Sequence, residues 1–203
     1  IEGVEFDLLD STGKNIIKHV KTDKNGKAEI KNLDIGKYIL RETKTRKEYK
    51  IALEQNITIE WGKTLNLTIE NEKMKGKVKI TKISEDDTLI TGEVAGTPIA
   101  NVKFEIYDDS GKLVDTLITK TDGIAISKDL VVGKYIVKEK ETGEYYEINE
   151  NDFEVEITKN GEVVGLTISN KSKTPPPEKP KEETPKIEVP PIEPIKKLPV
   201  TGY

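Results

Sequence analysis

The chain of 203 residues has no cysteine and only one histidine, one tryptophan and one methionine. Without cysteine there can be no disulfide, no thiolate metal ligand and no cysteine nucleophile. The lone histidine, His19, gives no basis for a zinc site or a histidine-based catalytic triad. We therefore expect no metal, no cofactor and no enzymatic turnover.

Long apolar runs are missing as well. Hydrophobic and charged residues each make up 34% of the chain, and this modest supply of core residues favours small β-rich units over one large globule. No apolar run is long enough to cross a membrane, and no signal peptide is recognisable. Lysine and glutamate are interspersed at a net charge of −4, so no nucleic-acid partner is expected. Because the sequence begins at Ile1 inside a strand-like pattern, we expect it to be a piece of a longer protein.

Three segments of the first half recur in the same order in the second half. The pairs are residues 1–14 (IEGVEFDLLDSTGK) with 99–112 (IANVKFEIYDDSGK), 36–42 (GKYILRE) with 133–139 (GKYIVKE), and 67–71 (LTIEN) with 166–170 (LTISN). Such ordered matches predict a tandem duplication. The first repeat is expected to span residues 1–73 and the second repeat residues 74–173.

Both repeats have the pattern of β-structure. In the first repeat Val4, Phe6 and Leu8 alternate with acidic residues, which is the period of a half-buried strand. Turn signals containing glycine separate such segments, namely 10–13 (DSTG), 25–26 (NG), 108–111 (DDSG), 122–123 (DG) and 160–161 (NG). The predicted fold class is all-β, with two tandem immunoglobulin-like β-sandwiches.

The two repeats differ at their beginnings. The second repeat has an additional predicted strand, residues 77–82 (KVKITK), whose counterpart in the first repeat would precede Ile1. The first repeat is therefore expected to lack its first strand and to carry an unpaired edge. Trp61, in a predicted turn, is expected to cover the end of its repeat or the contact between repeats. The alternative is an exposed aromatic used in adhesion.

The composition changes abruptly near the end of the chain. Residues 174–197 contain eight of the ten prolines, together with five lysines and five glutamates. This segment cannot bury a core and favours extended polyproline II, so we interpret it as a linker that crosses the cell wall. The LPxTG pattern recognised by sortases follows it, as Leu198, Pro199, Val200, Thr201 and Gly202.

The Gly-Lys-Tyr-Ile-x-x-Glu and Leu-Thr-Ile-x-Asn segments resemble two related groups of Gram-positive domains. These are the B-type domains of collagen adhesins and the SpaA-type domains of pilins, and the resemblance covers residues 1–173. It implies a prealbumin-like, inverse immunoglobulin fold in a secreted protein that is covalently anchored to the cell wall. It also implies that sortase cleaves after Thr201 and transfers its carbonyl to an amine of the peptidoglycan cross-bridge or to a pilin lysine.

A spontaneous lysine–asparagine amide bond, promoted by a buried acid, is also implied by this resemblance. The candidates in the second repeat are Lys82, Glu139 and Asn170. Strand periodicity supports them, because each is in phase with apolar neighbours: Val78 and Ile80, Tyr135 and Val137, and Leu166 and Ile168, respectively. Two other readings remain open: a buried Lys82–Glu139 ion pair hydrogen-bonded to Asn170, or three unrelated strand ends.

The chemistry of the bond fits these residue types. Desolvation favours a neutral, nucleophilic lysine amine. A protonated Glu139 would polarise the Asn170 carboxamide and pass a proton to the departing ammonia. In the first repeat the corresponding residues are Glu42 and Asn71. Their lysine would precede Ile1, so both are expected to remain unreacted.

Two functions are compatible with these features. The favoured one is the structural stalk of a wall-anchored adhesin or minor pilin. The alternative is an adhesive module that itself binds a host extracellular-matrix ligand such as collagen. For the whole protein, any contact with a host matrix protein is expected to involve domains upstream of Ile1.

Overall fold

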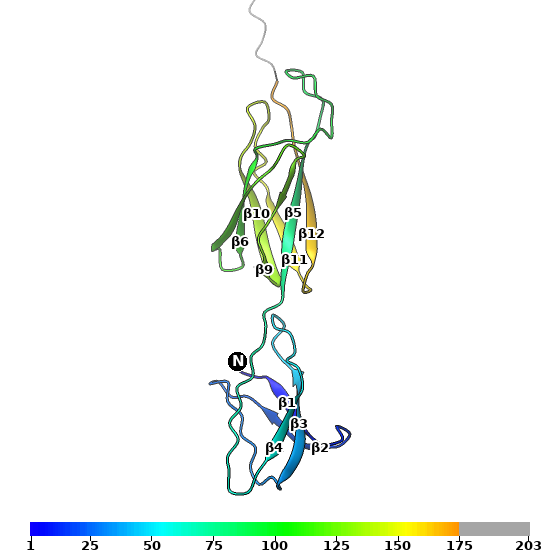
Figure 1. Cartoon of the computed structure of the whole chain (residues 1–203). Coiled ribbons are helices and arrows are strands. Elements are labelled where there is room, and N and C mark those ends of the chain that lie inside the picture. Colours follow the sequence, from blue (N-terminus) through cyan, green and yellow to red (C-terminus); the bar gives the residue numbers. More distant parts are fainter. Residues whose placement is uncertain (175–203) are drawn as a thin grey trace, which may run out of the picture.

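The computed structural model describes residues 1–174, which form an elongated molecule with the two repeats stacked end to end (Figure 1). These residues contain twelve strands and no helix. The described part of the chain therefore has no helix that could cross a membrane. The all-β fold class is thus confirmed. Of the C-terminal predictions, residues 175–197 of the linker and the motif at 198–202 lie outside the described residues.

The second repeat is a sandwich of two sheets. Its strands are β5 (Lys75–Ser84), β6 (Lys103–Asp108), β7 (Leu113–Ile118), β8 (Ile124–Ile126), β9 (Leu130–Val131), β10 (Gly133–Glu141), β11 (Asp152–Ile157) and β12 (Val163–Asn170). One sheet has the order β11-β10-β6-β7, and the other has the order β12-β5-β8, with β9 also paired to β5. The strand predicted at residues 77–82 is therefore confirmed as part of β5.

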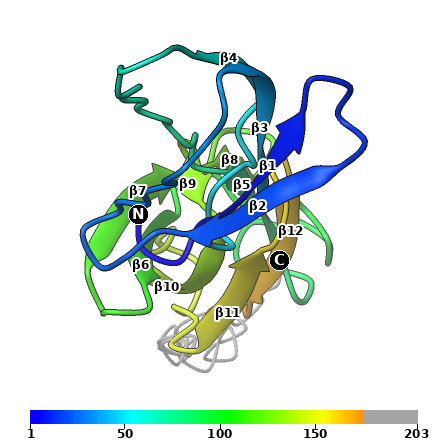
Figure 2. The same ribbon diagram turned by 90° about the horizontal axis from the view of Figure 1, so that it is seen from below.

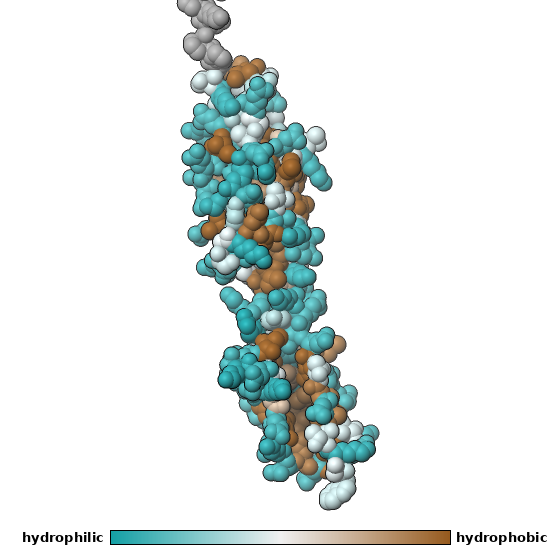
Figure 3. Space-filling model, turned by 90° about the vertical axis from the view of Figure 1, so that its left-hand side faces the viewer, coloured by the Kyte–Doolittle hydropathy of each residue, from teal (hydrophilic) through white to brown (hydrophobic). Residues whose placement is uncertain are grey.

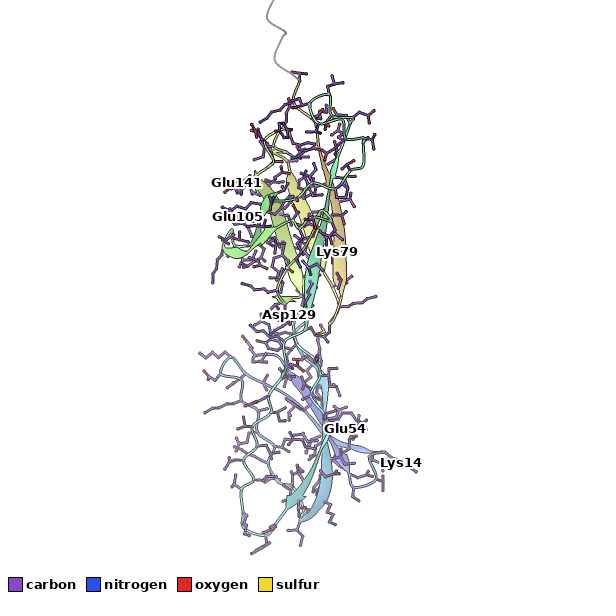
Figure 4. All side chains as sticks on the ribbon, turned by 45° about the horizontal axis from the view of Figure 1, so that its top comes forward. Lys14, Glu54, Lys79, Glu105, Asp129 and Glu141 are labelled. Carbon is purple, nitrogen blue, oxygen red and sulfur yellow. The ribbon has the colours of Figure 1, made fainter. Side chains whose placement is uncertain are left out.

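The two sheets enclose one apolar core. Every second residue of β5 is buried, and the inward residues Val78 and Ile80 meet Phe104, Ile106 and Val137 from the opposite sheet. Lysine and glutamate side chains occupy many of the alternate positions. Figure 4 labels Glu105 and Glu141, which lie on neighbouring strands of one sheet, and Lys79 on the other. This alternation is the one the sequence predicts for a sandwich.

The first and last strands of this sandwich run side by side in the same direction. β12 pairs with β5 in parallel over eight residue pairs, from Val163 opposite Lys77 to Asn170 opposite Ser84. The chain enters β5 at the end of the sandwich that faces the first repeat and leaves β12 at the far end (Figure 1). A pull along the molecule therefore loads this pair of strands in shear.

The first repeat reproduces only one of the two sheets. Its strands are β1 (Glu5–Asp10), β2 (Ile16–Lys21), β3 (Gly36–Lys44) and β4 (Gln55–Ile59). Their order, β2-β1-β3-β4, matches β7-β6-β10-β11 of the second repeat strand for strand. The duplication seen in the sequence is therefore also present in the sheet topology.

The predicted sandwich is not completed in the first repeat, because residues 67–71 do not form a strand. Their counterpart β12 obtains its backbone partners from β5, and residues 1–73 contain no equivalent of β5. Residues 27–29, which correspond to β8, are likewise not a strand. A strand without a neighbour has no hydrogen-bond ladder to hold it, so one missing strand removes the whole second sheet.

The first repeat has a correspondingly thin core. Its buried apolar residues are Val4, Phe6, Leu8 and Leu9, whereas Leu53 is 90% exposed and Trp61 is 88% exposed. Figure 3 shows apolar surface along this repeat. The prediction that Trp61 covers the end of its repeat is wrong: its turn follows β4, where no second sheet is present to pack against it.

One residue ties the two repeats together at their junction. The backbone N–H of Met74 donates to Glu48 O at 2.8 Å, and its carbonyl accepts from Val132 N–H at 3.1 Å. Seen along the long axis in Figure 2, the repeats lie one behind the other. Force applied along the molecule therefore passes from the first repeat to β5 through this short connection.

Candidate functional site

The strands β5, β10 and β12 bring Lys82, Glu139 and Asn170 together inside the second repeat. Their exposed fractions are 0%, 5% and 2%, so the predicted inward phase of all three residues is confirmed. The parallel register places Lys82 opposite Ile168, one inward position before Asn170. Glu139 reaches the same point from the other sheet, where it lies opposite Phe104.

The polar atoms of the three side chains are in direct contact. Nζ of Lys82 hydrogen-bonds to Oδ1 of Asn170, and it lies 3.0 Å from Oε2 of Glu139 without the alignment of a hydrogen bond. Nδ2 of Asn170 donates to Oε1 of Glu139 at 2.5 Å. They therefore form one cluster, and the reading as three unrelated strand ends is excluded.

Burial changes the chemistry of the lysine. Loss of solvent lowers the pKa of Lys82, although the neighbouring Glu139 opposes this shift. A buried ion pair of this kind costs several kcal/mol per ion in desolvation, which the mutual attraction of the charges repays only in good geometry. The environment therefore favours the neutral amine, which is the nucleophilic form.

The orientation of the Asn170 carboxamide assigns different neighbours to its two ends. The carbonyl oxygen faces the lysine, and the nitrogen faces Glu139. Of the two roles expected for Glu139, the structure is arranged for proton delivery to the nitrogen, because Oε1 of Glu139 contacts Nδ2 of Asn170. Glu139 is not placed to polarise the carbonyl, because Oδ1 of Asn170 is turned towards Lys82.

One polar neighbour of the cluster was missed in the sequence. The Asn170 nitrogen also donates to Oγ1 of Thr142 at 2.9 Å. Thr142 follows the end of β10 and is only half-buried. A signal for it exists, since a threonine stands three residues after the acid in both repeats, as Thr45 after Glu42 and Thr142 after Glu139.

The equivalent groups of the first repeat are paired with each other. Nδ2 of Asn71 lies 2.8 Å from each carboxylate oxygen of Glu42 and 2.9 Å from the carbonyl of Lys50. Glu42 also accepts from the backbone N–H of Ala52 at 2.8 Å. Within residues 1–174 no lysine ammonium contacts either side chain. The hydroxyl of Thr45 is buried here without a hydrogen-bond partner.

The sequence matches the SpaA prealbumin-like fold domain twice, over residues 1–73 and 76–172. The chain belongs to this family. The family match thus covers both repeats, in agreement with the duplication seen in the sequence and in the sheet topology.

Individual relatives match parts of larger proteins. The "Trypsin-resistant surface T6 protein" of Streptococcus pyogenes serotype M6 is 33% identical over 81 residues, which are 40% of this chain and 15% of that protein. The solved structure of the Bacillus anthracis TIE protein is 31% identical, with a TM-score of 0.72 over 85% of this chain and 31% of that chain. The chain therefore spans less than a third of either relative.

A third relative shows the fold alone. The C-terminal fragment of the pilus adhesin SpaC from Lactobacillus rhamnosus GG is 14% identical, with a TM-score of 0.53. The similarity covers 86% of this chain and 91% of that fragment.

Proposed function

We propose that this chain is a stalk segment of a Gram-positive surface adhesin or minor pilin, in which residues 1–73 and 74–173 are two successive domains. Membership of the SpaA family supports a surface role, and so does the similarity to the trypsin-resistant surface T6 protein. The end-to-end arrangement of the repeats suits a spacer that projects a distal part away from the cell (Figure 1).

The observation that carries the proposal is the buried contact between Lys82 on the first strand of the second repeat and Asn170 on its last. We infer that these two side chains become joined by an isopeptide bond. A surface stalk under shear has its weakest point in the hydrogen bonds between strands. A covalent link between the first and last strands removes that weakness.

The proposed reaction proceeds within the cluster and needs no other reagent. The Lys82 ammonium passes one proton to Oε2 of Glu139, and the neutral amine attacks Cγ of Asn170. Glu139 then gives its proton to Nδ2 and takes a second proton from Nζ. The Cγ–Nδ2 bond breaks and one ammonia leaves. The product is a neutral amide beside a protonated Glu139, so the ion pair no longer has to be kept in the core.

The intact mass of the chain tests this proposal. The parent protein is expected to be lighter than its sequence mass by one ammonia. Lys82→Ala and Asn170→Ala are each expected to have the full sequence mass. A parent of full mass, whose Lys82 reacts with amine reagents in the folded protein, would leave only an ordinary buried ion pair.

We further propose that the chain is anchored through Thr201, although this part lies outside the described residues. The LPxTG pattern supports this, together with the proline-rich segment that precedes it. Sortase would cleave between Thr201 and Gly202, and the Thr201 carbonyl would pass to a peptidoglycan amine or a pilin lysine. Incubation with a sortase and a short oligoglycine amine should remove Gly202 and Tyr203. If sortase processes Thr201→Ala as well as the parent chain, residues 198–202 are not a sortase motif.

A second function, adhesion by the repeats themselves, is favoured by one specific observation. Trp61 is 88% exposed, and the first repeat carries further exposed apolar side chains such as Leu53. Exposed aromatic residues with apolar neighbours are typical of binding surfaces. Binding of the chain to immobilised collagen, and its loss in Trp61→Ala, would support adhesion. Absence of binding to collagen and other matrix proteins would leave the stalk function.

A further inference from the structure

The nitrogen that leaves as ammonia in the proposed reaction is held by two different acceptors. Nδ2 of Asn170 has two N–H groups; one donates to Glu139 Oε1 at 2.5 Å and the other to Thr142 Oγ1 at 2.9 Å. Together these bonds use the full donor capacity of the nitrogen. They also fix the rotation of the carboxamide, with its oxygen turned towards the lysine.

We propose that Thr142 is a positioning residue for isopeptide formation: its hydroxyl holds the departing nitrogen so that Glu139 can deliver a proton to it. This inference rests on the proposed cross-link and adds to it a specific residue outside the Lys82–Glu139–Asn170 set.

The chemistry gives the hydroxyl a defined task. An amide nitrogen is a poor leaving group until it is protonated, and the proton must arrive along the lone pair that appears when Lys82 attacks Cγ. Without Thr142 the nitrogen would be held only by Glu139, and the final torsion of asparagine is broad and roughly two-fold. The Thr142 acceptor removes that freedom, and it also accepts a hydrogen bond from the ammonium that forms when Nδ2 is protonated.

Thr142 also differs from the other members of the cluster in its exposure. Lys82, Glu139 and Asn170 are buried, whereas Thr142 is half-buried. The Asn170 nitrogen therefore has one neighbour, Thr142, that is partly open to solvent.

The first repeat provides an internal comparison for this role. It has the same acid, asparagine and threonine but no lysine at the site, and there the Asn71 nitrogen is bound to Glu42 and the Lys50 carbonyl instead of to Thr45. The Thr45 hydroxyl is buried and has no partner. Such a hydroxyl costs about 1–3 kcal/mol, and a valine would avoid that cost. A threonine at this position in both repeats is thus explained by the complete cluster, where its hydroxyl has a partner.

The test compares the rate of ammonia loss in the full parent chain and in three variants of it. Each is made by brief cell-free synthesis, and its intact mass is followed over time. Thr142→Val keeps the shape of the side chain but removes the acceptor, and it should slow the loss about tenfold, as expected for one hydrogen bond to the leaving group. Thr142→Ser keeps the hydroxyl and should react within about twofold of the parent. Thr45→Val, the same change in the first repeat, is the matched control and should react at the parental rate.

The outcomes separate this inference from the cross-link itself. If the parent never loses ammonia, the proposed function fails and the role of Thr142 fails with it. If the parent reacts and Thr142→Val reacts equally fast, the cross-link stands and the positioning role is wrong. If serine slows the reaction as much as valine does, the methyl group matters for packing and the hydroxyl does not, which also overturns the inference. Folding is checked by the melting temperature of each variant in a Lys82→Met background, where no bond can form.

Discussion

Nζ of Lys82 and Oε2 of Glu139 lie 3.0 Å apart in the second repeat, and neither side chain is exposed to solvent. A buried pair of opposite charges adds little net stability, because desolvation offsets most of the attraction. The pair makes better sense as the starting point of a reaction. Transfer of one proton neutralises both groups and leaves an amine in contact with the Asn170 carboxamide.

The role of Glu139 as proton carrier is tested by Glu139→Gln. Glutamine keeps the size and an acceptor oxygen but cannot take a proton from Lys82, so this variant is expected to retain its full sequence mass. It should also be less stable, because the bond closes a loop of 88 residues, and a disulfide closing such a loop would contribute roughly 4–5 kcal/mol. Intact mass and chemical denaturation measure the two effects.

The control for this variant is Glu141→Gln. Glu141 is exposed and pairs with Lys103 at 2.8 Å on the outside of the sheet. Glu141→Gln should lose one ammonia at the same rate as the parent chain. Ammonia loss from Glu139→Gln at the parental rate would show that another group carries the proton.

The first repeat should contribute nothing to the mass deficit. Among the described residues Asn71 contacts Glu42 but no lysine ammonium, so the parent chain is expected to lose one ammonia and not two. Glu42→Gln should leave that deficit unchanged. It should destabilise the first repeat by about 1–3 kcal/mol, because Asn71 and the Ala52 N–H lose a charged acceptor. Peptide mapping that finds Asn71 linked to any lysine would contradict this assignment.

The buried cluster was predictable because strands have a period of two. Lys82, Glu139 and Asn170 are each in phase with apolar residues, and that phase alone assigns them to the interior. Their mutual contact depends on register between strands that are far apart in the sequence, and the residues alone did not determine it. Thr142 could not be assigned in this way, since it lies beyond the end of β10, where the alternation stops.

The first repeat shows the limit of the sequence pattern more clearly. Residues 67–71 and 166–170 are nearly identical, yet only the second segment forms a strand. The difference lies in β5, which supplies the ladder for β12 and has no counterpart in residues 1–73. Local sequence specifies which face of a strand is apolar, but a neighbouring strand determines whether the strand exists. The exposure of Trp61 has the same cause.

The altered pKa of Lys82 predicts a pH dependence in a chain that cannot react. Burial lowers this pKa from 10.5, so the unfolded state binds the proton more strongly than the folded state does. The resulting destabilisation is present at neutral pH and is relieved as the pH rises towards 10.5. Two chains are compared: Glu139→Gln, and a double variant that carries Lys82→Met as well. Neither chain has a carboxylate at this site, so the difference between them reports on Lys82.

The expected result is a difference in unfolding free energy that is smaller at about pH 10 than at pH 7. Denaturant unfolding at a series of pH values measures it. The other lysines titrate in both chains and cancel. A difference that stays constant over this range would mean that Lys82 is not desolvated.

Trp61 gives a prediction about the first repeat. Because its side chain is 88% exposed, Trp61→Ala should change the unfolding free energy by less than about 0.5 kcal/mol. Unfolding is followed by circular dichroism, since the chain has no other tryptophan to report fluorescence. A loss above about 1 kcal/mol would restore the interpretation that Trp61 covers the end of its repeat.

The central claim is that force crosses the second repeat through covalent bonds, and single-molecule stretching between the two ends of the chain tests it most directly. In the parent, force enters along β5 and leaves along β12 through the Lys82–Asn170 link, so the residues between them should not extend. In Lys82→Ala the same pull should release a further segment of roughly 300 Å, from the 88 residues that separate the two positions. An extension of that size in the parent as well would contradict the account.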